Sequence, residues 1–233
     1  MSFTIGILGG MGPLATNHFL RQILVKVQAT RDQDYPNIVL SSHAKTPDRS
    51  AYLMGEGPSP VPALVRQLAW LSEEADVIAM PCNTAHAFHG LLQSRCPVPI
   101  LHMPSLCVEH LAKSNVYDVL LLGTEGALYA NIYQSLLRER GIQCSIPPHD
   151  LQMQVENAIA TIKQGGYPDE DFFAAVDDYA DELDCDRILL GCTELSMVCE
   201  EFDFPATDPT NQLANAALMQ AMEASAKYHA ADK

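Results

Sequence analysis

Two cysteines that lie far apart in the chain occur in nearly identical local settings. Cys82 follows the apolar run Asp76–Met80, and Cys192 follows the similar run Asp186–Leu190. Short apolar runs of this kind are typical of buried parallel strands. Asn and Thr, which are common where helices start, come next after the two cysteines. We therefore expect each thiol at the carboxyl end of a strand, just before a helix.

This setting suits thiols that transfer protons. The carboxyl ends of parallel strands form the ligand-binding edge of open α/β sheets. A helix N-terminus stabilises a thiolate, so we expect the pKa of each thiol to be lowered toward neutrality from about 8.5. Two thiols on opposite sides of one carbon atom can remove a proton from one face and deliver another to the opposite face. Cys82 and Cys192 are the candidate catalytic pair, with Asn83, Thr84 and Thr193 as hydrogen-bond donors.

The composition indicates a globular, acidic protein. The chain has 233 residues, of which 48% are hydrophobic and 18% charged, enough for a packed core. Its formal net charge of −15 argues against nucleic acid or an anionic membrane as a partner. We find neither a membrane-span-length apolar stretch nor a signal-peptide pattern, and expect a cytoplasmic protein. The seven cysteines include no C-x-x-C motif and should stay reduced.

Strand-like and helix-like segments alternate along the chain, which predicts an α/β fold with mostly parallel sheets flanked by helices. Strands are expected near 3–9, 37–42, 76–80, 98–101, 118–122, 186–190 and, more weakly, 204–207. Helical periodicity predicts helices near 14–29, 61–75, 84–95, 104–114, 127–140, 151–165, 169–183 and 210–229. The acidic residues of 169–182 interleave with apolar ones at helical spacing, so we interpret them as a solvated helix face and expect no metal site.

The chain also repeats itself loosely. A glycine-ended strand precedes each cysteine, with about 72 residues from Gly10 to Cys82 and about 69 from Gly123 to Cys192. We expect two related lobes that each present one thiol to a shared cleft. Residues 1–100 would form the first lobe and 101–207 the second, and the helix within 208–233 would pack back on the first.

The glycine-rich segment Gly6–Pro13 resembles a nucleotide-binding loop only superficially. Its glycines do not follow the G-x-G-x-x-G spacing, and the strand near 37–42 lacks the acidic residue that would hold a ribose. The segment instead predicts a tight turn around Met11, where backbone N–H groups meet an anion such as a substrate carboxylate.

Three motifs now stand in order: residues 5–16, 81–86 and 191–195. Together they resemble the aspartate/glutamate racemase family, most closely its aspartate racemase branch, and the resemblance covers essentially the whole chain. It implies two pseudo-symmetric lobes with the active site in the cleft between them, and a homodimer. It also implies racemisation of an acidic amino acid, aspartate before glutamate, by two cysteines without pyridoxal phosphate or another cofactor.

The resemblance assigns further residues to the site. It implies that Arg49 binds a substrate carboxylate, that Lys163 stabilises the enediolate-like transition state, and that Thr124 lies near the substrate. Ala127 stands where relatives commonly carry a second Thr, which leaves substrate preference open. Glu194 is a candidate to accept the substrate ammonium group or to act as a proton-relay partner of Cys192. Alternatively, it is a structural residue in the first helical turn.

Several alternatives remain at this point. By analogy with the family, Cys82 would deprotonate the D-enantiomer and Cys192 the L-enantiomer. His86 would tune the first thiol or simply pack, and a zinc site built on these three residues lacks a fourth ligand. Rival functions are hydantoin racemase, maleate isomerase, in which one cysteine attacks the substrate covalently, and a non-catalytic protein that binds a small acid.

Overall fold

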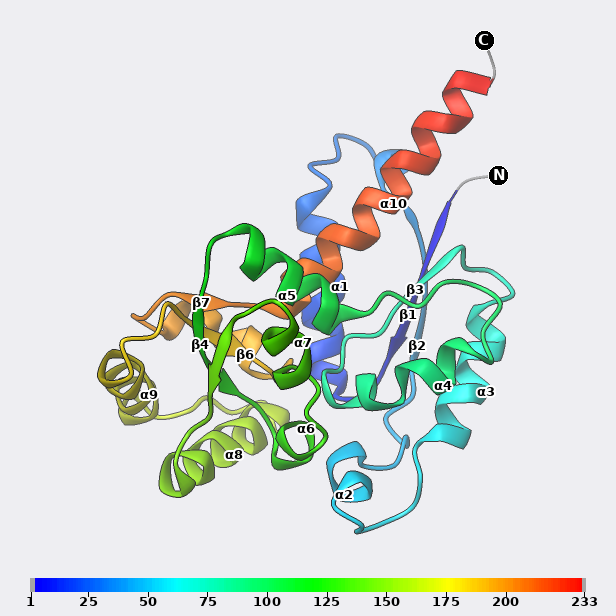
Figure 1. The fold of residues 1–233 in the computed structure, drawn as a ribbon. Coiled ribbons are helices and arrows are strands. Elements are labelled where there is room, and N and C mark those ends of the chain that lie inside the picture. Colours follow the sequence, from blue (N-terminus) through cyan, green and yellow to red (C-terminus); the bar gives the residue numbers. More distant parts are fainter. Residues whose placement is uncertain (1–2, 232–233) are drawn as a thin grey trace.

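The computed structural model describes residues 3–231 and contains two parallel β-sheets, each flanked by helices (Figure 1). The first sheet has the order β2-β1-β3, from β1 (Thr4–Gly9), β2 (Asn37–Ser42) and β3 (Val77–Ala79). The second has the order β5-β4-β6-β7, from β4 (Asp118–Leu122), β5 (Gln143–Ser145), β6 (Arg187–Leu190) and β7 (Ala206–Thr207). The predicted α/β class with parallel sheets is confirmed.

The two sheets match each other strand by strand. In each, the first strand in sequence pairs on one side with the second strand and on the other with the strand that leads to a cysteine. On the side of β3 away from β1, a parallel bridge joins Ile78 to Ile100, at the place that β7 occupies beside β6. The molecule is therefore built from two pseudo-symmetric lobes.

An aspartate at the equivalent position in each lobe fixes the start of the strand that leads to the cysteine. Asp76 accepts a hydrogen bond from the backbone N–H of Thr4 at 2.7 Å, and its own N–H donates to the carbonyl of Thr4 at 2.9 Å. Asp186 makes the equivalent contacts with the start of β4, through Tyr117 N–H at 2.6 Å and the carbonyl of Asp118 at 3.0 Å. These pairs fix the register of β3 and β6, and so fix how far each cysteine extends beyond its sheet.

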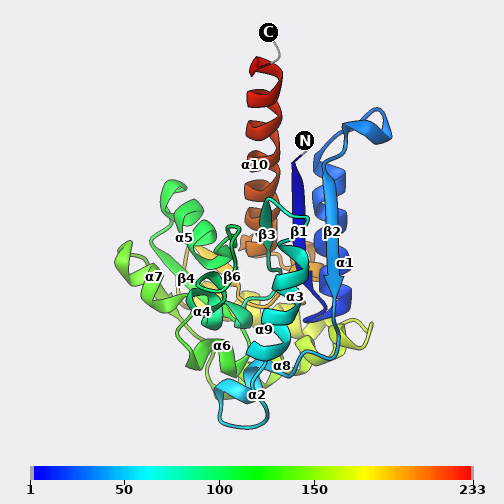
Figure 2. The same cartoon turned by 90° about the vertical axis from the view of Figure 1, so that its right-hand side faces the viewer.

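Helices cover both faces of the first sheet, as Figure 2 shows. One face packs against α1 (Pro13–Lys26) and α10 (Pro209–Ala231), and the other against α3 (Val61–Leu71) and α4 (His89–Gln93). In α1, Pro13 stands in the first turn, where its missing N–H costs nothing. Phe19 and Ile23 lie four residues apart on one stripe and pack against the sheet.

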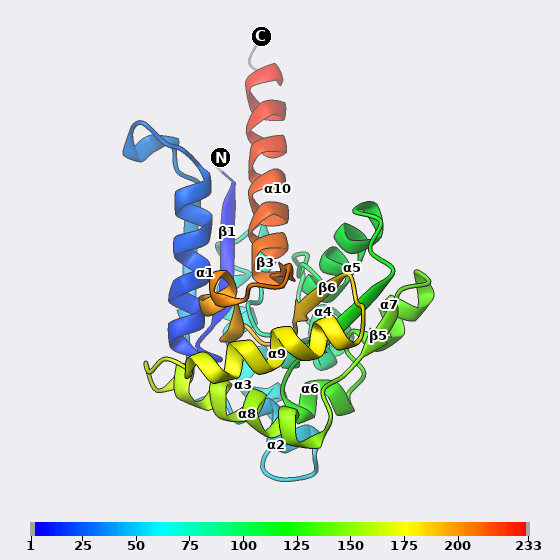
Figure 3. The same cartoon turned by 90° about the vertical axis from the view of Figure 1, so that its left-hand side faces the viewer.

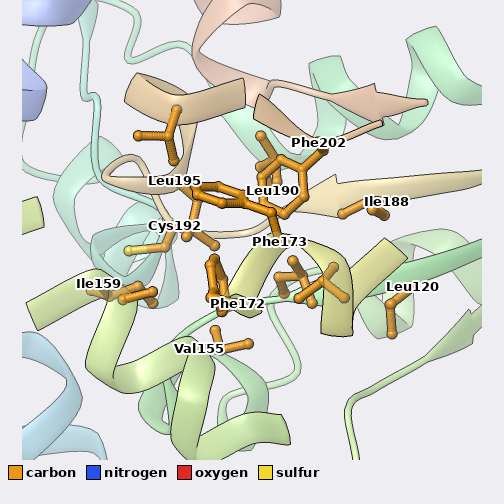
Figure 4. Packing of buried hydrophobic residues seen from close by; sticks show 14 of the residues in the cluster. Leu120, Val155, Ile159, Phe172, Phe173, Ile188, Leu190, Cys192, Leu195 and Phe202 are labelled. Carbon is orange, nitrogen blue, oxygen red and sulfur yellow. The ribbon is translucent and has the colours of Figure 1, made fainter. Parts of the chain in front are cut away.

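The second sheet is enclosed in the same way. Helices α8 (His149–Lys163) and α9 (Glu170–Glu182) cover one face, and α5 (Met103–Lys113) and α7 (Gln134–Glu139) cover the other (Figure 3). Figure 4 shows the first of these interfaces, where Phe172, Phe173 and Phe202 pack edge to face. Cys192 belongs to this cluster, so the second thiol is anchored in the core of its lobe.

The C-terminal helix returns to the first lobe. Leu213, Ala214 and Ala217 of α10 are buried against β1 and β3, while the end of the helix extends beyond both sheets (Figure 1). The extremes of the predicted first lobe and of the predicted helix, residues 1–2 and 232–233, lie outside the described residues. Within 3–231, no helix is both long enough and apolar enough to cross a membrane.

Some predicted elements are wrong in detail. The short polar strand β5 and the five-residue helix α2 (Arg49–Leu53) were not predicted, because neither has a periodic apolar run. The helix predicted at 127–140 is divided into α6 (Glu125–Tyr129) and α7, because Asn131 adopts a left-handed φ of 52° between them. The helix predicted after Cys82 begins as the 3-10 helix η2 (Thr84–Phe88) and continues as α4, whereas the segment after Cys192 forms only the 3-10 helix η3 (Leu195–Glu201).

The two lobes approach each other closely where α2 meets α6. A Cβ atom added at Gly126 would lie 2.4 Å from the Cα of Ser50, a distance that real Cβ contacts do not show. Only glycine therefore permits this contact between the lobes.

We expect Gly126→Ala to lower the free energy of unfolding by about 1–3 kcal/mol, because the added methyl group must push α2 and α6 apart. Urea unfolding measures this change. Gly90→Ala is the matched control in a short helix, since nothing lies within 4 Å of its added Cβ, and it should change stability by less than about 1 kcal/mol. Equal effects of the two substitutions would contradict the close approach.

Candidate active site

The carboxyl ends of both sheets meet around one cavity. Its inner chamber has a volume of about 20 Å³. The chamber is lined by Met11, Asp48, Arg49, Ser50, Cys82, Asn83, Thr84, Thr124, Lys163, Cys192, Thr193 and Glu194. All ten site residues predicted from the sequence are in this set, together with Asp48 and Ser50, which were not predicted.

A wider outer chamber of about 270 Å³ leads to the inner one. The two chambers share Met11, Asp48, Arg49, Lys163 and Glu194, so they are successive parts of a single opening. Beyond the shared residues, the outer chamber is lined by Gly10, Gly12, Pro13, Leu14, Ala44 and Thr46. A ligand that reaches the two thiols therefore passes between two cations and two carboxylates.

His86 holds the turn that presents Cys82. Its Nδ1 lies 2.8 Å from the carbonyl oxygen of Cys82, and its Nε2 accepts the N–H of Met103 at 3.2 Å. Both ring nitrogens are thus occupied by the backbone, and the ring is buried. Burial, followed by the nearby His102, lowers the pKa of His86 to about 3, so the ring is neutral at physiological pH. Of the two roles considered for His86, the packing role fits this geometry.

Cys192 is presented by a turn that only glycine can form. The N–H of Gly191 donates to the carbonyl of Leu122 at 2.6 Å, and a Cβ at Gly191 would lie 2.7 Å from that same oxygen. The Cys192 thiol then donates to Oε2 of Glu194 at 3.0 Å. Burial, together with the negative charge of Glu194, raises the pKa of Cys192 well above its usual value. The predicted lowering of this pKa is therefore wrong, and Cys192 is a protonated thiol.

The other thiol faces a cation instead of a carboxylate. Burial alone would lower the pKa of Arg49, yet the pKa is raised, because Cys82, Asp48 and Glu194 all favour the charged guanidinium. The guanidinium is held in place by the carbonyls of Pro47 at 3.1 Å and of Met11 at 3.3 Å. Arg49 is thus positioned to stabilise a thiolate at Cys82.

Lys163 brings a second cation to the cavity from the end of α8. Burial of its ammonium group would lower its pKa, but the pKa is raised, because the ionised form of Cys192 and the carboxylates of Glu194 and Asp48 all favour the charged ammonium. The attraction also acts in reverse, since Lys163 opposes part of the rise in the pKa of Cys192. A cation therefore lies near each sulfur. On the Cys192 side, the negative charge of Glu194 raises the thiol pKa and so opposes the effect of Lys163.

Hydroxyl groups bridge the two lobes at the inner chamber. Thr124, at the start of α6, accepts from Ser50 at 2.8 Å and lies 3.3 Å from the hydroxyl of Thr84. Thr193 donates to Glu194 at 3.4 Å. Thr84 and Thr193 were predicted to donate to the thiols, but their hydroxyl groups contact oxygen atoms of Thr124 and Glu194 instead. Ser50 supplies a second hydroxyl group beside that of Thr124. Relatives commonly carry such a second hydroxyl on a Thr at the position of Ala127.

Three buried polar atoms at the inner chamber have no hydrogen-bond partner among the described residues. They are Nε of Arg49, Nδ2 of Asn83 and Oε1 of Glu194. A buried polar atom without a partner carries a substantial energetic cost. Two donors and one acceptor around the same small space suit a ligand with a carboxylate and an ammonium group.

Sequence reasoning missed three residues of this region. Asp48 and Ser50 are the sequence neighbours of Arg49, so including the residues on either side of the predicted arginine would have found them. Tyr133 lies behind Asn83, and its hydroxyl donates to Oδ1 of Asn83 at 2.5 Å. Tyr133 is 50 residues away in the sequence, within a segment whose periodicity indicated only an ordinary helix.

Comparison with known proteins identifies the family. The sequence profile of the Asp/Glu/Hydantoin racemase family matches residues 8–217. This chain belongs to that family. It is 29% identical over 225 residues to the broad specificity amino-acid racemase RacX of Bacillus subtilis, with 90% of this chain and 94% of the relative covered.

Solved structures of this family have the same fold. Picrophilus torridus aspartate racemase superposes with a TM-score of 0.81 at 30% identity, covering 94% of each chain. Glutamate racemase from Francisella tularensis, in complex with D-glutamate, superposes with a TM-score of 0.71 at 15% identity, covering 96% of this chain and 82% of that one. The two-lobed architecture is shared across these racemases, and the protein is an isomerase of the amino-acid racemase class.

Burial and the carboxylate of Glu194 predict that Cys192 is not ionised in the resting protein, because both raise its pKa. Near neutral pH we therefore expect Cys192→Ala to leave the ultraviolet thiolate absorbance of the folded protein unchanged. The background is low because burial raises the pKa of the five other cysteines, to about 11 for Cys144 and Cys199. A loss confined to Cys192→Ala would contradict the assignment.

His86 makes the stability of the protein depend on pH. Its pKa of about 3 in the folded state lies below the unfolded value of 6.5, so its contribution to stability is present above pH 6.5 and is lost as the pH falls toward 3. Between pH 6.5 and 5 we expect a loss of about 2 kcal/mol in the free energy of unfolding from this residue. Urea unfolding of wild type and His86→Gln at both pH values measures it. An equal pH slope in the two proteins would contradict the prediction.

Proposed function

We propose that the protein racemises an α-amino acid by proton transfer between Cys82 and Cys192, with aspartate as the first candidate substrate and glutamate as the second. The observation that carries this proposal is the unequal pair of thiols at one chamber, one beside a guanidinium and the other hydrogen-bonded to a carboxylate. A two-base reaction needs one base and one acid at the same time, on opposite faces of the reacting carbon.

In the proposed reaction, the Cys82 thiolate takes the α-proton and becomes a thiol. The electron pair of the broken C–H bond moves into the α-carboxylate and gives an enediolate, which the nearby cations stabilise. Cys192 then delivers its proton to the opposite face of the carbon and becomes a thiolate. The family analogy assigns Cys82 to the D-enantiomer, so the reaction written in this direction starts from the D-amino acid.

Glu194 has two parts in this scheme. Its Oε2 accepts the Cys192 thiol, which keeps the proton on the sulfur until the carbanion forms. Its Oε1 is buried without a partner among the described residues and is the acceptor that suits a substrate ammonium group. When Cys192 has given up its proton, Lys163 faces the new thiolate and limits the repulsion from Glu194.

The cations support an acidic substrate. Arg49 has a free buried Nε and a planar guanidinium, the geometry that binds carboxylates best. Lys163 is a second positive group on the same cavity. A dicarboxylic amino acid supplies one carboxylate for each cation, whereas a neutral side chain would leave one of them unpaired.

A second candidate is a racemase with a wider substrate range. The outer chamber of about 270 Å³ extends beyond the reacting centre and includes the apolar Pro13, Leu14 and Ala44. Side chains longer than that of aspartate have room there. The Bacillus subtilis relative carries the name of a broad specificity amino-acid racemase.

The remaining parts of the proposal come from the family resemblance and from the sequence. The resemblance implies a homodimer that needs no pyridoxal phosphate and has an acidic amino acid as its small-molecule partner. The sequence patterns predict a cytoplasmic protein with lobes at 1–100 and 101–207 and a C-terminal helix within 208–233. The rival functions of the same superfamily are hydantoin racemase and maleate isomerase. A binding protein without turnover is the rival from another class.

Hydrogen exchange in D2O tests the reaction. Without added cofactor, we expect the wild type to replace the α-hydrogen of aspartate with deuterium and to racemise it, as followed by NMR and optical rotation. Cys82→Ser and Cys192→Ser should each abolish racemisation, and each should retain exchange from one enantiomer only, because one base remains. The same assay on a panel of longer amino acids separates the two candidates.

The outcomes against the proposal are distinct. Near wild-type racemisation in either serine variant would exclude the two-thiol scheme. No exchange with any amino acid would favour a binding protein or another substrate class, and a covalent cysteine adduct with maleate, seen by mass spectrometry, would favour the isomerase.

A further inference from the structure

Tyr133 reaches from one lobe to the cysteine turn of the other. It stands immediately before α7 and is only 2% exposed. Its neighbours in the core of the second lobe include Leu111, Leu137 and Leu189, which fix the ring in place. Its hydroxyl is the polar end of an otherwise apolar contact, and it meets the side chain of Asn83, the residue after Cys82.

The length of this hydrogen bond identifies which atom of Asn83 it involves. The distance of 2.5 Å from the tyrosine oxygen to Oδ1 of Asn83 fits an O–H···O bond and is shorter than N–H···O bonds usually are. Burial, followed by the nearby Cys107, raises the pKa of Tyr133 well above its usual value, so the hydroxyl stays protonated and donates. Oδ1 is therefore the acceptor.

Fixing the oxygen of a primary amide also fixes its nitrogen, because both atoms are bonded to the same planar carbon. Nδ2 of Asn83 is buried and has no partner among the described residues, and Asn83 lines the inner chamber between Cys82 and Thr84. If the amide turned over, its oxygen would take the place of the donor and would repel a carboxylate. One hydroxyl thus selects the orientation that favours an anion.

We propose that Tyr133 is a positioning residue: it holds the amide of Asn83 with Nδ2 directed toward the inner chamber, where the amide donates to a carboxylate oxygen of the substrate. This inference rests on the proposed function for the identity of the ligand. We assign this contact to the side-chain carboxylate, which takes up no charge during the reaction, so it would be made to the substrate and to the transition state alike. Losing it should therefore weaken binding rather than slow the chemical step.

Tyr133→Phe removes only the hydroxyl and keeps the buried ring. We expect KM for L-aspartate to rise about 3- to 10-fold with kcat within about twofold, since a hydrogen bond to a charged group is partly lost. Asn83→Ala should raise KM by at least as much. In the double variant, the tyrosine substitution should add nothing, because the amide through which it acts is gone.

Leu137→Val is the matched control for a purely structural effect. Leu137 is fully buried in the same cluster as Tyr133. Its truncation should lower the thermal midpoint of unfolding without changing KM. A KM change in Leu137→Val as large as that in Tyr133→Phe would overturn the proposal, as would an unchanged KM in Tyr133→Phe or fully additive effects in the double variant.

A second measurement keeps this inference separate from the reaction. The side-chain amide signals of Asn83, assigned by NMR with the help of Asn83→Ala, should shift and lose their protection from hydrogen exchange in Tyr133→Phe. If the wild type turns over no amino acid, the proposed function fails, and these signals alone decide the role of Tyr133. Unchanged amide signals would overturn the positioning role in either case.

Discussion

Parallel strand pairing is the constraint on which the site depends. In both sheets every strand runs in the same direction, so the segments that follow the strands emerge at one edge. The two edges face each other, and residues from segments around Met11, Arg49, Cys82, Thr124 and Cys192 line one chamber. No local contact within either half would bring the two thiols together. The packing of the lobes does so, and the tight contact at Gly126 limits how far they can shift.

The two lobes share a backbone plan but differ in their charges. Each half carries a strand that starts at an aspartate and ends before a cysteine, with the same pairing around it. Nevertheless, Cys82 faces a guanidinium, whereas Cys192 donates its proton to a carboxylate. A symmetric scaffold with identical surroundings would give two thiols of the same acidity. The difference of partner, cation against carboxylate, gives the two thiols unlike electrostatic surroundings.

The parts of this arrangement that the sequence could predict are those encoded by neighbouring residues. The apolar runs that open at Asp76 and Asp186 located both cysteine-bearing strands, and the three family motifs contain seven of the ten site residues. The wider family resemblance supplied the other three, Arg49, Thr124 and Lys163. The ionisation of Cys192 could not be predicted, because it depends on how deeply the thiol is buried and on the direction of the Glu194 side chain. Tyr133 was missed for a related reason, since its partner Asn83 is close only in space. The 3-10 turns after the cysteines follow from tertiary packing, which overrides the helical preference of those segments.

The small volume of the inner chamber has a mechanical consequence. A space of about 20 Å³ holds roughly one water molecule, far less than an amino acid occupies. An amino acid therefore fits between the two thiols only when the lining residues move, and the hydroxyl contact between Ser50 and Thr124 is one that such a movement would affect.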